Sequence, residues 1–173
     1  RLAATATLAI SMLAACGEEK ETEQQEQNGA VEESHDVAFP VTVTDALGKE
    51  ITLEEAPDRI VSLTPSNTEI LFELGLDEEV VGVNDNDNYP EQVADKTRIG
   101  GIEYNIETII SLQPDVVFAH ESSMFTFESA IEQLEASGVT VFVVDNAETF
   151  DETYETIEVI GTLTGKDEEA DQI

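Results

Sequence analysis

The fold is decided by the stretch Arg59-Ile60-Val61-Ser62-Leu63-Thr64-Pro65-Ser66-Asn67-Thr68-Glu69-Ile70-Leu71, which predicts a strand, a tight loop and a helix in succession. Residues 59–63 form a β-branched run typical of a buried strand, and Pro65, which has no amide hydrogen to donate, ends it. Ser66 and Glu69 have the Ser-x-x-Glu spacing of a capping box, ahead of apolar residues that stop at Gly75. Open sheets bind ligands at loops between strand and helix, so this loop is either a ligand site or only a well-capped surface turn.

The alternation of strand and helix continues along the chain. The apolar, β-branched runs are residues 59–63, 80–83, 115–119 and 140–144. The helical patterns between them are residues 67–74, 106–112, after a possible Asn105 cap, and 125–136, which ends at Ser137 and Gly138. Alternating segments around residues 41–44 and 51–53 predict a hairpin ahead of these elements. We therefore predict an α/β fold, a Rossmann-like lobe whose mainly parallel sheet is flanked by helices on both faces.

The composition is that of a globular but strongly acidic chain. Its 173 residues are 40 % hydrophobic, which is enough for one domain with a core, and 39 acidic residues against 7 basic ones give a net charge of −32. Such a charge repels phosphate backbones, so nucleic acid is excluded as a partner. We expect an external and saline environment, although a solvated acidic face explains the composition equally simply.

Residues 1–15 are an apolar run of small residues, too short to span a bilayer, and have the character of a signal-peptide core. No initiating Met precedes them, so we expect the sequence to begin inside a longer precursor. The run ends Leu13-Ala14-Ala15-Cys16-Gly17, which resembles the lipobox of bacterial lipoproteins, where the Cys accepts a diacylglycerol. A small buried cysteine is the alternative reading for Cys16, but a polar tract rich in Glu and Gln follows it.

Residues 16–38 have the composition of a disordered acidic tether, in which His35 is expected to be a solvated side chain. A lipid on Cys16 would anchor the chain to a membrane, on the extracellular face of a bacterial, Gram-positive cell. Residues 150–173 have apolar side chains at helical spacing and nothing after them to cover them, so we expect the chain to be cut at this end as well.

Several motifs in this order and spacing resemble one family, the iron-siderophore and cobalamin class of substrate-binding proteins that serve ABC importers. The segments that carry the resemblance are Val43-Thr44-Asp45-Ala46-Leu47-Gly48, residues 59–69, Val81-Gly82-Val83, Tyr89-Pro90, Asn105-Ile106-Glu107 and Gln113-Pro114-Asp115-Val116-Val117. Ser66-Asn67-Thr68-Glu69 and Tyr89-Pro90 are nearest the cobalamin-binding branch. The match covers nearly the whole folded region.

The resemblance implies a monomer without a cofactor, built of two lobes joined by one long helix, with the ligand in the cleft between them. Residues 39–149 would be the N-terminal lobe and residues 150–173 the start of the interlobe helix, with the second lobe absent from this chain. The implied partners are a chelate (a ferric siderophore, cobalamin or haem), an ABC permease and, through the lipid anchor, a membrane.

By the same resemblance, this lobe lines the cleft with the loops that follow residues 63, 83 and 119. The ligand-binding residues predicted there are Pro65, Ser66, Asn67, Asn86, Tyr89 and His120. Aromatic side chains usually contact planar ligands, and these loops are poor in them, since Asn86 and His120 stand where cobalamin-binding relatives carry aromatics. His120 could donate a hydrogen bond or ligate the iron of a haem. The run at residues 84–88 is expected to be a solvated, flexible turn, with a hard-cation site as the alternative.

Glu107 is the predicted docking residue, because the resemblance implies that the Glu of the Asn-Ile-Glu motif contacts arginines of the permease. Its place in the first turn of a helix is also stabilising by itself, because a carboxylate interacts favourably with the positive end of the helix dipole.

Two other classes of protein remain open. An enzyme could use His120 with Glu121 or Asp145 as acid and base, but no nucleophile motif accompanies them. A receptor for free zinc or manganese usually needs several His residues, and this sequence has only two.

Overall fold

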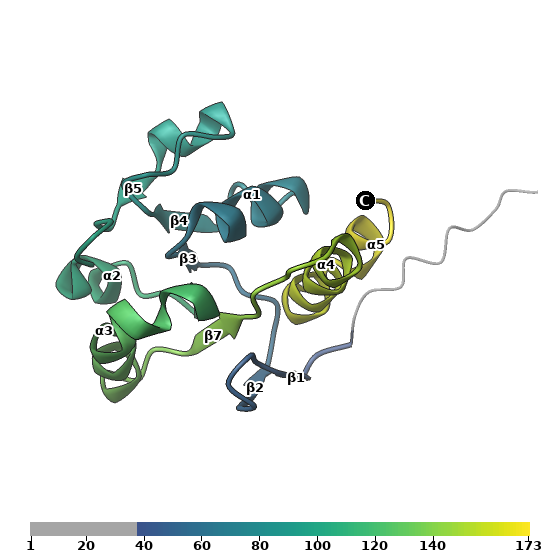
Figure 1. Ribbon diagram of the computed structural model, residues 1–173, viewed down its shortest axis with the longest axis horizontal. Helices are drawn as coiled ribbons and strands as arrows, with labels where there is room; N and C mark the ends of the chain where they lie inside the picture. Colours follow the sequence, from purple (N-terminus) through teal and green to yellow (C-terminus); the bar gives the residue numbers. More distant parts are fainter. Residues whose placement is uncertain (1–37) are drawn as a thin grey trace, which may run out of the picture. The chain divides into compact units, whose positions relative to one another are not determined.

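In the computed structural model, which describes residues 38–173, five strands form one parallel sheet in the order β5-β4-β3-β6-β7 (Figure 1). The strands are β3 (Ile60–Ser62), β4 (Val80–Val83), β5 (Thr97–Arg98), β6 (Val116–His120) and β7 (Val141–Val144). A separate antiparallel hairpin pairs β1 (Val41–Thr44) with β2 (Glu50–Leu53). The predicted α/β fold and the predicted hairpin are confirmed.

The central strand is β3, which pairs in parallel with β4 on one side and β6 on the other. The chain runs outward from β3 through β4 to β5, then crosses back to place β6 beside β3. The strand order therefore reverses between β3 and β6, and open α/β sheets bind ligands outside the carboxyl ends of the strands at such a reversal. Sequence analysis did not predict β5, because a strand of two residues is too short to show an alternating pattern.

Each face of the sheet carries its own core, because successive side chains of a strand point to opposite faces. Ile60 and Phe118 belong to one core, and Val61 and Val117 to the other. The first core is completed by apolar side chains of α1 (Pro65–Glu73) and α4 (Phe150–Thr164), and the second by those of α2 (Ile106–Ser111) and α3 (Met124–Ala136) (Figure 1). Helices cover both faces, as predicted.

The helix starts are partly as predicted. Asn105 caps α2, since its Oδ1 accepts a hydrogen bond from the Thr108 amide at 3.0 Å. The capping box predicted for Ser66 and Glu69 is wrong: α1 begins two residues earlier than predicted, with Thr64 as its N-cap and Pro65 as its first residue. Proline suits the first helical position for two reasons. Its ring fixes φ near the helical value, and the amide hydrogen that it lacks would have no partner within the helix at that position.

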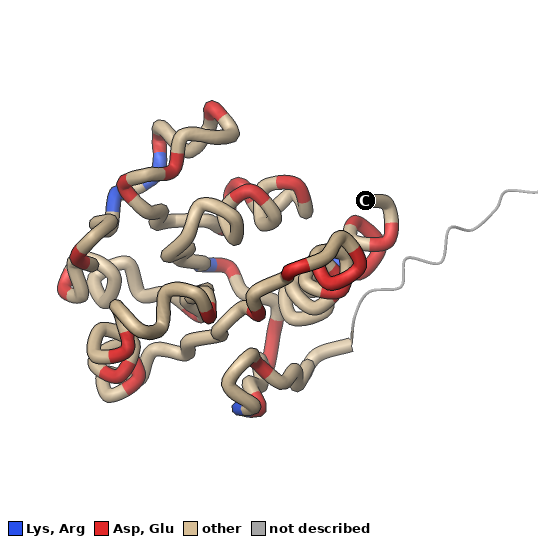
Figure 2. The backbone as a smooth tube through the Cα atoms, in the orientation of Figure 1, with Lys and Arg blue, Asp and Glu red and all other residues tan. Residues whose placement is uncertain are grey.

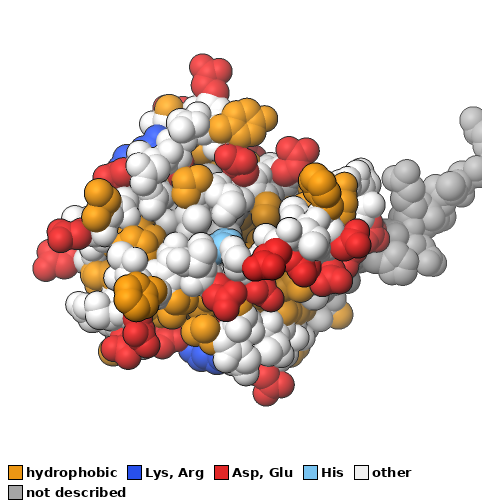
Figure 3. Space-filling view, viewed as in Figure 1, with side chains coloured by type: hydrophobic (Ala, Val, Ile, Leu, Met, Phe, Trp, Pro, Cys, Tyr) orange, Lys and Arg blue, Asp and Glu red, His pale blue; other side chains and the backbone are white. Residues whose placement is uncertain are grey.

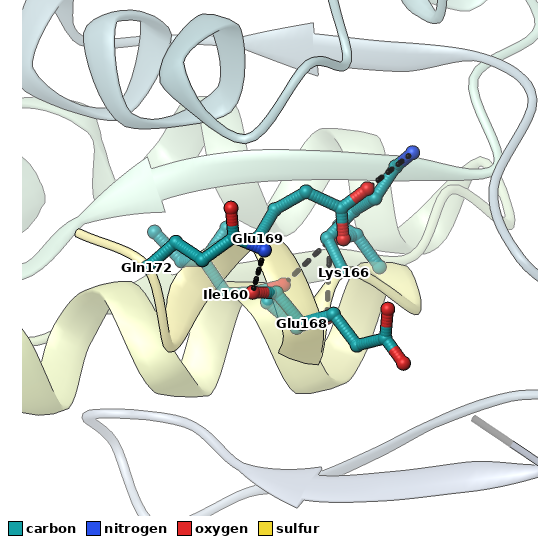
Figure 4. Close-up of polar contacts among 7 residues, drawn as sticks. Ile160, Lys166, Glu168, Glu169 and Gln172 are labelled. Atoms are coloured by element: carbon teal, nitrogen blue, oxygen red, sulfur yellow. Dashed lines mark hydrogen bonds and ion pairs between the residues drawn. The ribbon is translucent and has the colours of Figure 1, made fainter. Parts of the chain in front are cut away.

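The segment after Phe150 is two helices rather than one. α4 begins at Phe150 and ends at Thr164, where Gly165 takes a left-handed φ of 76° and lets Lys166 N reach Gly161 O at 2.7 Å. α5 (Asp167–Ala170) follows, with Lys166 Nζ 3.4 Å from Glu169 Oε1 (Figure 4). α4 is also not left uncovered, since Ile157, Ile160 and Leu163 are buried in the first core.

The run at residues 84–88 is a hydrogen-bonded turn that buries Asn84 and Asp87 and exposes the other three side chains, so the prediction of a solvated, flexible turn is wrong for these two residues. Asn84 and Asp87 are 4 % and 3 % exposed. Asn84 Nδ2 donates to Leu63 O at 2.8 Å, and Asp87 Oδ2 accepts from Thr68 Oγ1 at 2.7 Å and from the Asn84 amide at 3.1 Å. The turn is thereby tied to the end of β3 and to α1. Within residues 38–173, no group of three or more His, Cys, Asp or Glu residues could hold a metal ion.

Burial in this turn raises the pKa of the Asp87 carboxyl, and nearby Glu69 adds to the rise, while hydrogen bonds from Thr68 and the Asn84 amide and the charge of Arg98 oppose it. Tyr104 joins the same cluster by donating its hydroxyl to Leu63 O at 2.9 Å, and burial raises the pKa of Tyr104 to about 12. The cluster of Ser62, Leu63, Thr68, Asn84, Asp87 and Tyr104, called the edge cluster below, joins three segments that end at the carboxyl edge of the sheet.

Replacing Phe118 by Ala should lower the free energy of unfolding by about 3–5 kcal/mol, because the side chain is fully buried in the central part of the sheet and packs edge-on against Phe142 at 5.7 Å between ring centroids. Phe125→Ala is the matched control, since that ring is fully exposed, and it should change stability by no more than about 0.5 kcal/mol. Urea unfolding measures both. Equal effects of the two substitutions would contradict the assignment of the core.

The edge cluster also predicts a pH effect. An acid whose folded-state pKa is raised binds a proton on folding, so its stabilising contribution is complete below its ordinary pKa and is lost as the pH rises through the raised value. The unfolding free energy of the wild type, measured relative to Asp87→Asn, should therefore decrease with rising pH across that window. Asp95→Asn, at an exposed position, controls for the loss of one carboxyl. A wild-type advantage that grows with pH would show that Asp87 is held as a stabilising anion instead.

Candidate functional site

Four loops meet at the carboxyl edge of the sheet, because all five strands run parallel. They follow β3, β4, β6 and β7, and the reversal of strand order places the loops after β3 and β6 side by side. Figure 3 shows a single His side chain near the middle of one face, with both acidic and apolar side chains around it. His120 is the only histidine among residues 38–173, so this face is the one that presents the end of β6.

The loop after β3 divides its predicted residues between surface and interior. Ser66 is exposed and Pro65 is half-buried, so both remain accessible at this edge. Asn67 is fully buried, and its Nδ2 donates to Ala119 O at 3.0 Å. Its side chain therefore ties α1 to the end of β6 and is not exposed at the edge.

The loop after β4 presents Asn86 and Tyr89, which are both exposed. Asn86 Nδ2 is 3.0 Å from Asn84 Oδ1, so Asn86 stands directly on the edge cluster. Tyr89, 63 % exposed, lies beside α1 at a shallow hollow that Glu69 and Phe72 also line. The structure thus brings Ser66 and Asn86 to the same edge and sets Tyr89 toward its outer side.

His120 ends β6 and is half-buried. Its Nδ1 accepts a hydrogen bond from the Ser122 amide at 3.2 Å and lies 2.8 Å from Ser122 Oγ. Because a backbone amide can only donate, the proton of the neutral imidazole is on Nε2. Burial lowers the pKa of His120, while the charges of Glu121 and Asp145 oppose the shift. In this arrangement His120 offers an uncharged N–H donor to a ligand. To ligate a metal through Nε2, the ring would have to carry its proton on Nδ1 instead, and the hydrogen bond from the Ser122 amide would be lost.

The edge is better supplied with aromatic side chains than sequence analysis predicted. Phe125, at the start of α3, is fully exposed, and Phe127 packs against Tyr104 with ring centroids 4.3 Å apart. Phe150, at the start of α4, is 85 % exposed. These residues were missed because the prediction considered only the loops, whereas the first turn of a helix that follows a parallel strand also lies at the carboxyl edge. The signal was present in the sequence, since Phe125 is off the helical face that buries Ile131 and Leu134.

A cavity of about 430 Å³ lies beyond the end of β7, between the β1–β2 turn and α4. Its apolar wall includes Val144 and Ile160, while Asp145, Glu148 and Glu155 supply carboxylates. The Asn146 amide, on the same loop, donates to Glu121 Oε2 at 3.4 Å, which connects the cavity to the loop that follows His120. This cavity, called the side chamber below, is therefore part of the same carboxyl edge.

Glu107 occupies the first turn of α2 and is exposed. The segment before α2 is fixed to the sheet, since Asn105 N donates to Ile99 O at 2.8 Å and Ile99 N to Val83 O at 3.1 Å. Glu107 is thus held on a capped helix near the carboxyl end of β4. Cys16 and the tether lie outside the described residues.

A model of the periplasmic binding protein family matches residues 60–173. The uncharacterized ABC transporter substrate-binding lipoprotein YvrC of Bacillus subtilis is 44 % identical over 96 % of this chain and 51 % of its own length. A cobalamin-binding protein of Halobacterium salinarum is 35 % identical over 74 % of this chain and 35 % of its own.

Solved structures agree with these relatives. A possible iron-binding, periplasmic solute-binding protein of Staphylococcus epidermidis is 39 % identical, with a TM-score of 0.65 over 68 % of this chain and 46 % of that one. The haem-binding protein HmuT is 27 % identical, with a TM-score of 0.68 over 78 % of this chain and 44 % of that one. The chain spans about half, or less, of the length of the proteins it matches. This chain belongs to the periplasmic binding protein family, which is a family of binding proteins and not of enzymes.

Proposed function

We propose that this chain forms the N-terminal lobe of the substrate-binding component of an ABC importer, which takes up cobalamin, haem or an iron chelate such as a ferric siderophore. The observation that carries the proposal is the set of loops at the reversal of strand order, where accessible polar groups and exposed aromatic rings converge. The relatives named for cobalamin, iron and haem support this ligand class. A second lobe would close over the same edge.

The chemistry of the edge suits a large ligand with a flat or macrocyclic face. Phe125 and Phe150 offer exposed rings, which give wide contact at little cost in conformational entropy. His120 offers one oriented N–H, and Ser66 and Asn86 offer polar groups that can hydrogen-bond amide or hydroxyl substituents. The edge cluster beneath them fixes the loops before the ligand arrives, which lowers the entropy lost on binding.

Two other functions have less support. Capture of a free divalent metal needs several close ligands, and residues 38–173 contain no group of three or more residues that could hold one. An enzymatic role for His120 with Glu121 or Asp145 is not supported, because the family that the chain belongs to consists of binding proteins.

We further propose that Cys16 carries a lipid and that residues 16–38 act as a tether on the extracellular face of a bacterial membrane. The lipobox-like sequence supports this proposal, as does the naming of the Bacillus subtilis relative as a lipoprotein. Among the helices of residues 38–173, none is long and apolar enough to cross a bilayer. Glu107, presented on a capped helix, would dock onto arginines of the permease.

Titration of the protein expressed from its whole gene with cyanocobalamin, haem and a ferric hydroxamate should shift the visible absorbance band of at least one of them. His120→Ala should weaken that binding by about threefold to tenfold, the worth of one hydrogen bond. His35→Ala is the matched control and should leave the affinity unchanged. Absence of a response to every chelate would contradict the proposed function, and an unchanged affinity in His120→Ala would remove His120 from the site.

Glu107→Ala should raise by about tenfold the protein concentration needed to stimulate ATP hydrolysis by the reconstituted transporter, because an orienting ion pair with the permease is lost. Ligand affinity should not change, since Glu107 lies on α2 and not on the loops that follow β3 and β6. Glu132→Ala, which removes an exposed carboxylate from α3, is the control. Equal stimulation by both variants would exclude Glu107 from docking.

A further inference from the structure

The carboxyl edge of the lobe is almost without positive charge. Five Lys and Arg residues lie in the part of the chain that the structure describes, namely Lys49, Arg59, Lys96, Arg98 and Lys166 (Figure 2). Lys49 pairs with Glu135 at 2.6 Å, and Lys166 with Glu169 at 3.4 Å. Arg59 precedes β3, so it lies at the opposite, amino edge of the sheet, where its Nε donates to Leu112 O at 2.6 Å.

The remaining two cations lie on the β5 side of the sheet and are held by backbone carbonyls. Lys96 Nζ donates to Asp77 O. Arg98 ends β5, and its guanidinium donates to Asn84 O at 2.8 Å, to Asp87 O at 2.9 Å and to Val93 O at 3.3 Å. The Arg98 fork is thus used to hold the turn after β4, and it is not directed at the centre of the edge.

Carboxylates, in contrast, surround the ends of β6 and β7. Glu121 follows His120 directly, Asp145 follows β7, and Glu148 and Asp151 stand at the start of α4. All four are exposed. The side chamber adds Asp45 and Glu155 to the same region. Figure 3 shows acidic side chains close to a histidine on one face of the molecule.

Charges of one sign that line a concave surface add together, and an ion of the same sign is repelled from it. The effect on a ligand grows with the charge of that ligand and declines as salt shortens the Debye length to about 10 Å at 0.1 M. His120 does not offset the carboxylates, because its neutral form is the one that the Ser122 amide selects. An anionic chelate would therefore meet repulsion from this lobe and find no available cation on its central loops.

We infer that this lobe selects chelates that carry no net negative charge, such as a neutral corrinoid or a ferric hydroxamate with a protonated amine, over haem with its two carboxylates and over ferric tris-catecholates. The inference rests on the proposed function and deepens it by naming the charge class of the ligand. The side chamber, with its apolar wall and its carboxylates, is the feature of the edge that matches an alkylammonium arm.

The test compares four probes on the protein expressed from its whole gene: cyanocobalamin, a ferric trihydroxamate bearing a free amine, haem and a ferric tris-catecholate. At low salt, one of the first two should bind at least about tenfold more tightly than either anion, and the anions should gain relative affinity as salt is added. Glu121→Gln combined with Asp145→Asn should strengthen binding of the tris-catecholate by about threefold or more at low salt.

The matched control is Glu54→Gln combined with Glu55→Gln, which removes the same charge from exposed positions on the chain leading into the amino end of β3. It should leave all four affinities unchanged. If an anionic chelate binds as tightly as the neutral or cationic probes, or if both double variants act alike, the inference about charge is overturned while the proposed function stands. If none of the four chelates binds, the proposed function itself fails.

Discussion

The parallel pairing of β3 with β6 is the constraint on which the rest of the lobe depends. These strands are far apart in the sequence, because β4 and β5 lie between them along the chain and are placed on the other side of β3. The strand order therefore reverses between β3 and β6, and at their carboxyl ends the loop at Thr64 lies next to the loop at His120. Asn67 then closes the junction by donating to Ala119 O from a fully buried position. The location of the site is thus a consequence of topology before any ligand is considered.

A second level of organisation is the edge cluster, which converts adjacent loops into a fixed surface. Leu63 O accepts hydrogen bonds from both Asn84 and Tyr104, so a single carbonyl at the end of β3 joins two separate segments. Asp87 adds α1 through Thr68. The hydrogen bonds to Leu63 O and Asp87 Oδ2 make alternative loop conformations costly, because breaking them would leave further buried polar atoms without a partner. The accessible residues above the cluster are consequently presented on a preorganised support.

The sequence was sufficient to predict the architecture, because the alternation of β-branched runs with helical patterns is long and repeated. The sequence-based prediction was less accurate for residues that fit two different structural roles. Ser66 fits a capping box, yet the ring of Pro65 already favours the first helical position, so the helix starts earlier than predicted. Asn84 and Asp87 belong to a polar run typical of a solvated turn, and only the tertiary contacts with Leu63 and Thr68 show why these two side chains are buried. No local pattern carries such long-range partners.

The central claim is that the carboxyl edge around the β3–β6 junction binds a chelate. Hydrogen–deuterium exchange of the protein with and without its tightest-binding chelate tests this claim most directly. The amides of residues 64–67, 84–90 and 120–127 should exchange more slowly when the ligand is bound, while residues 54–58 and 112–115, at the amino edge, should not change. Protection confined to the amino edge, or saturating binding without protection of the three loops, would contradict the account.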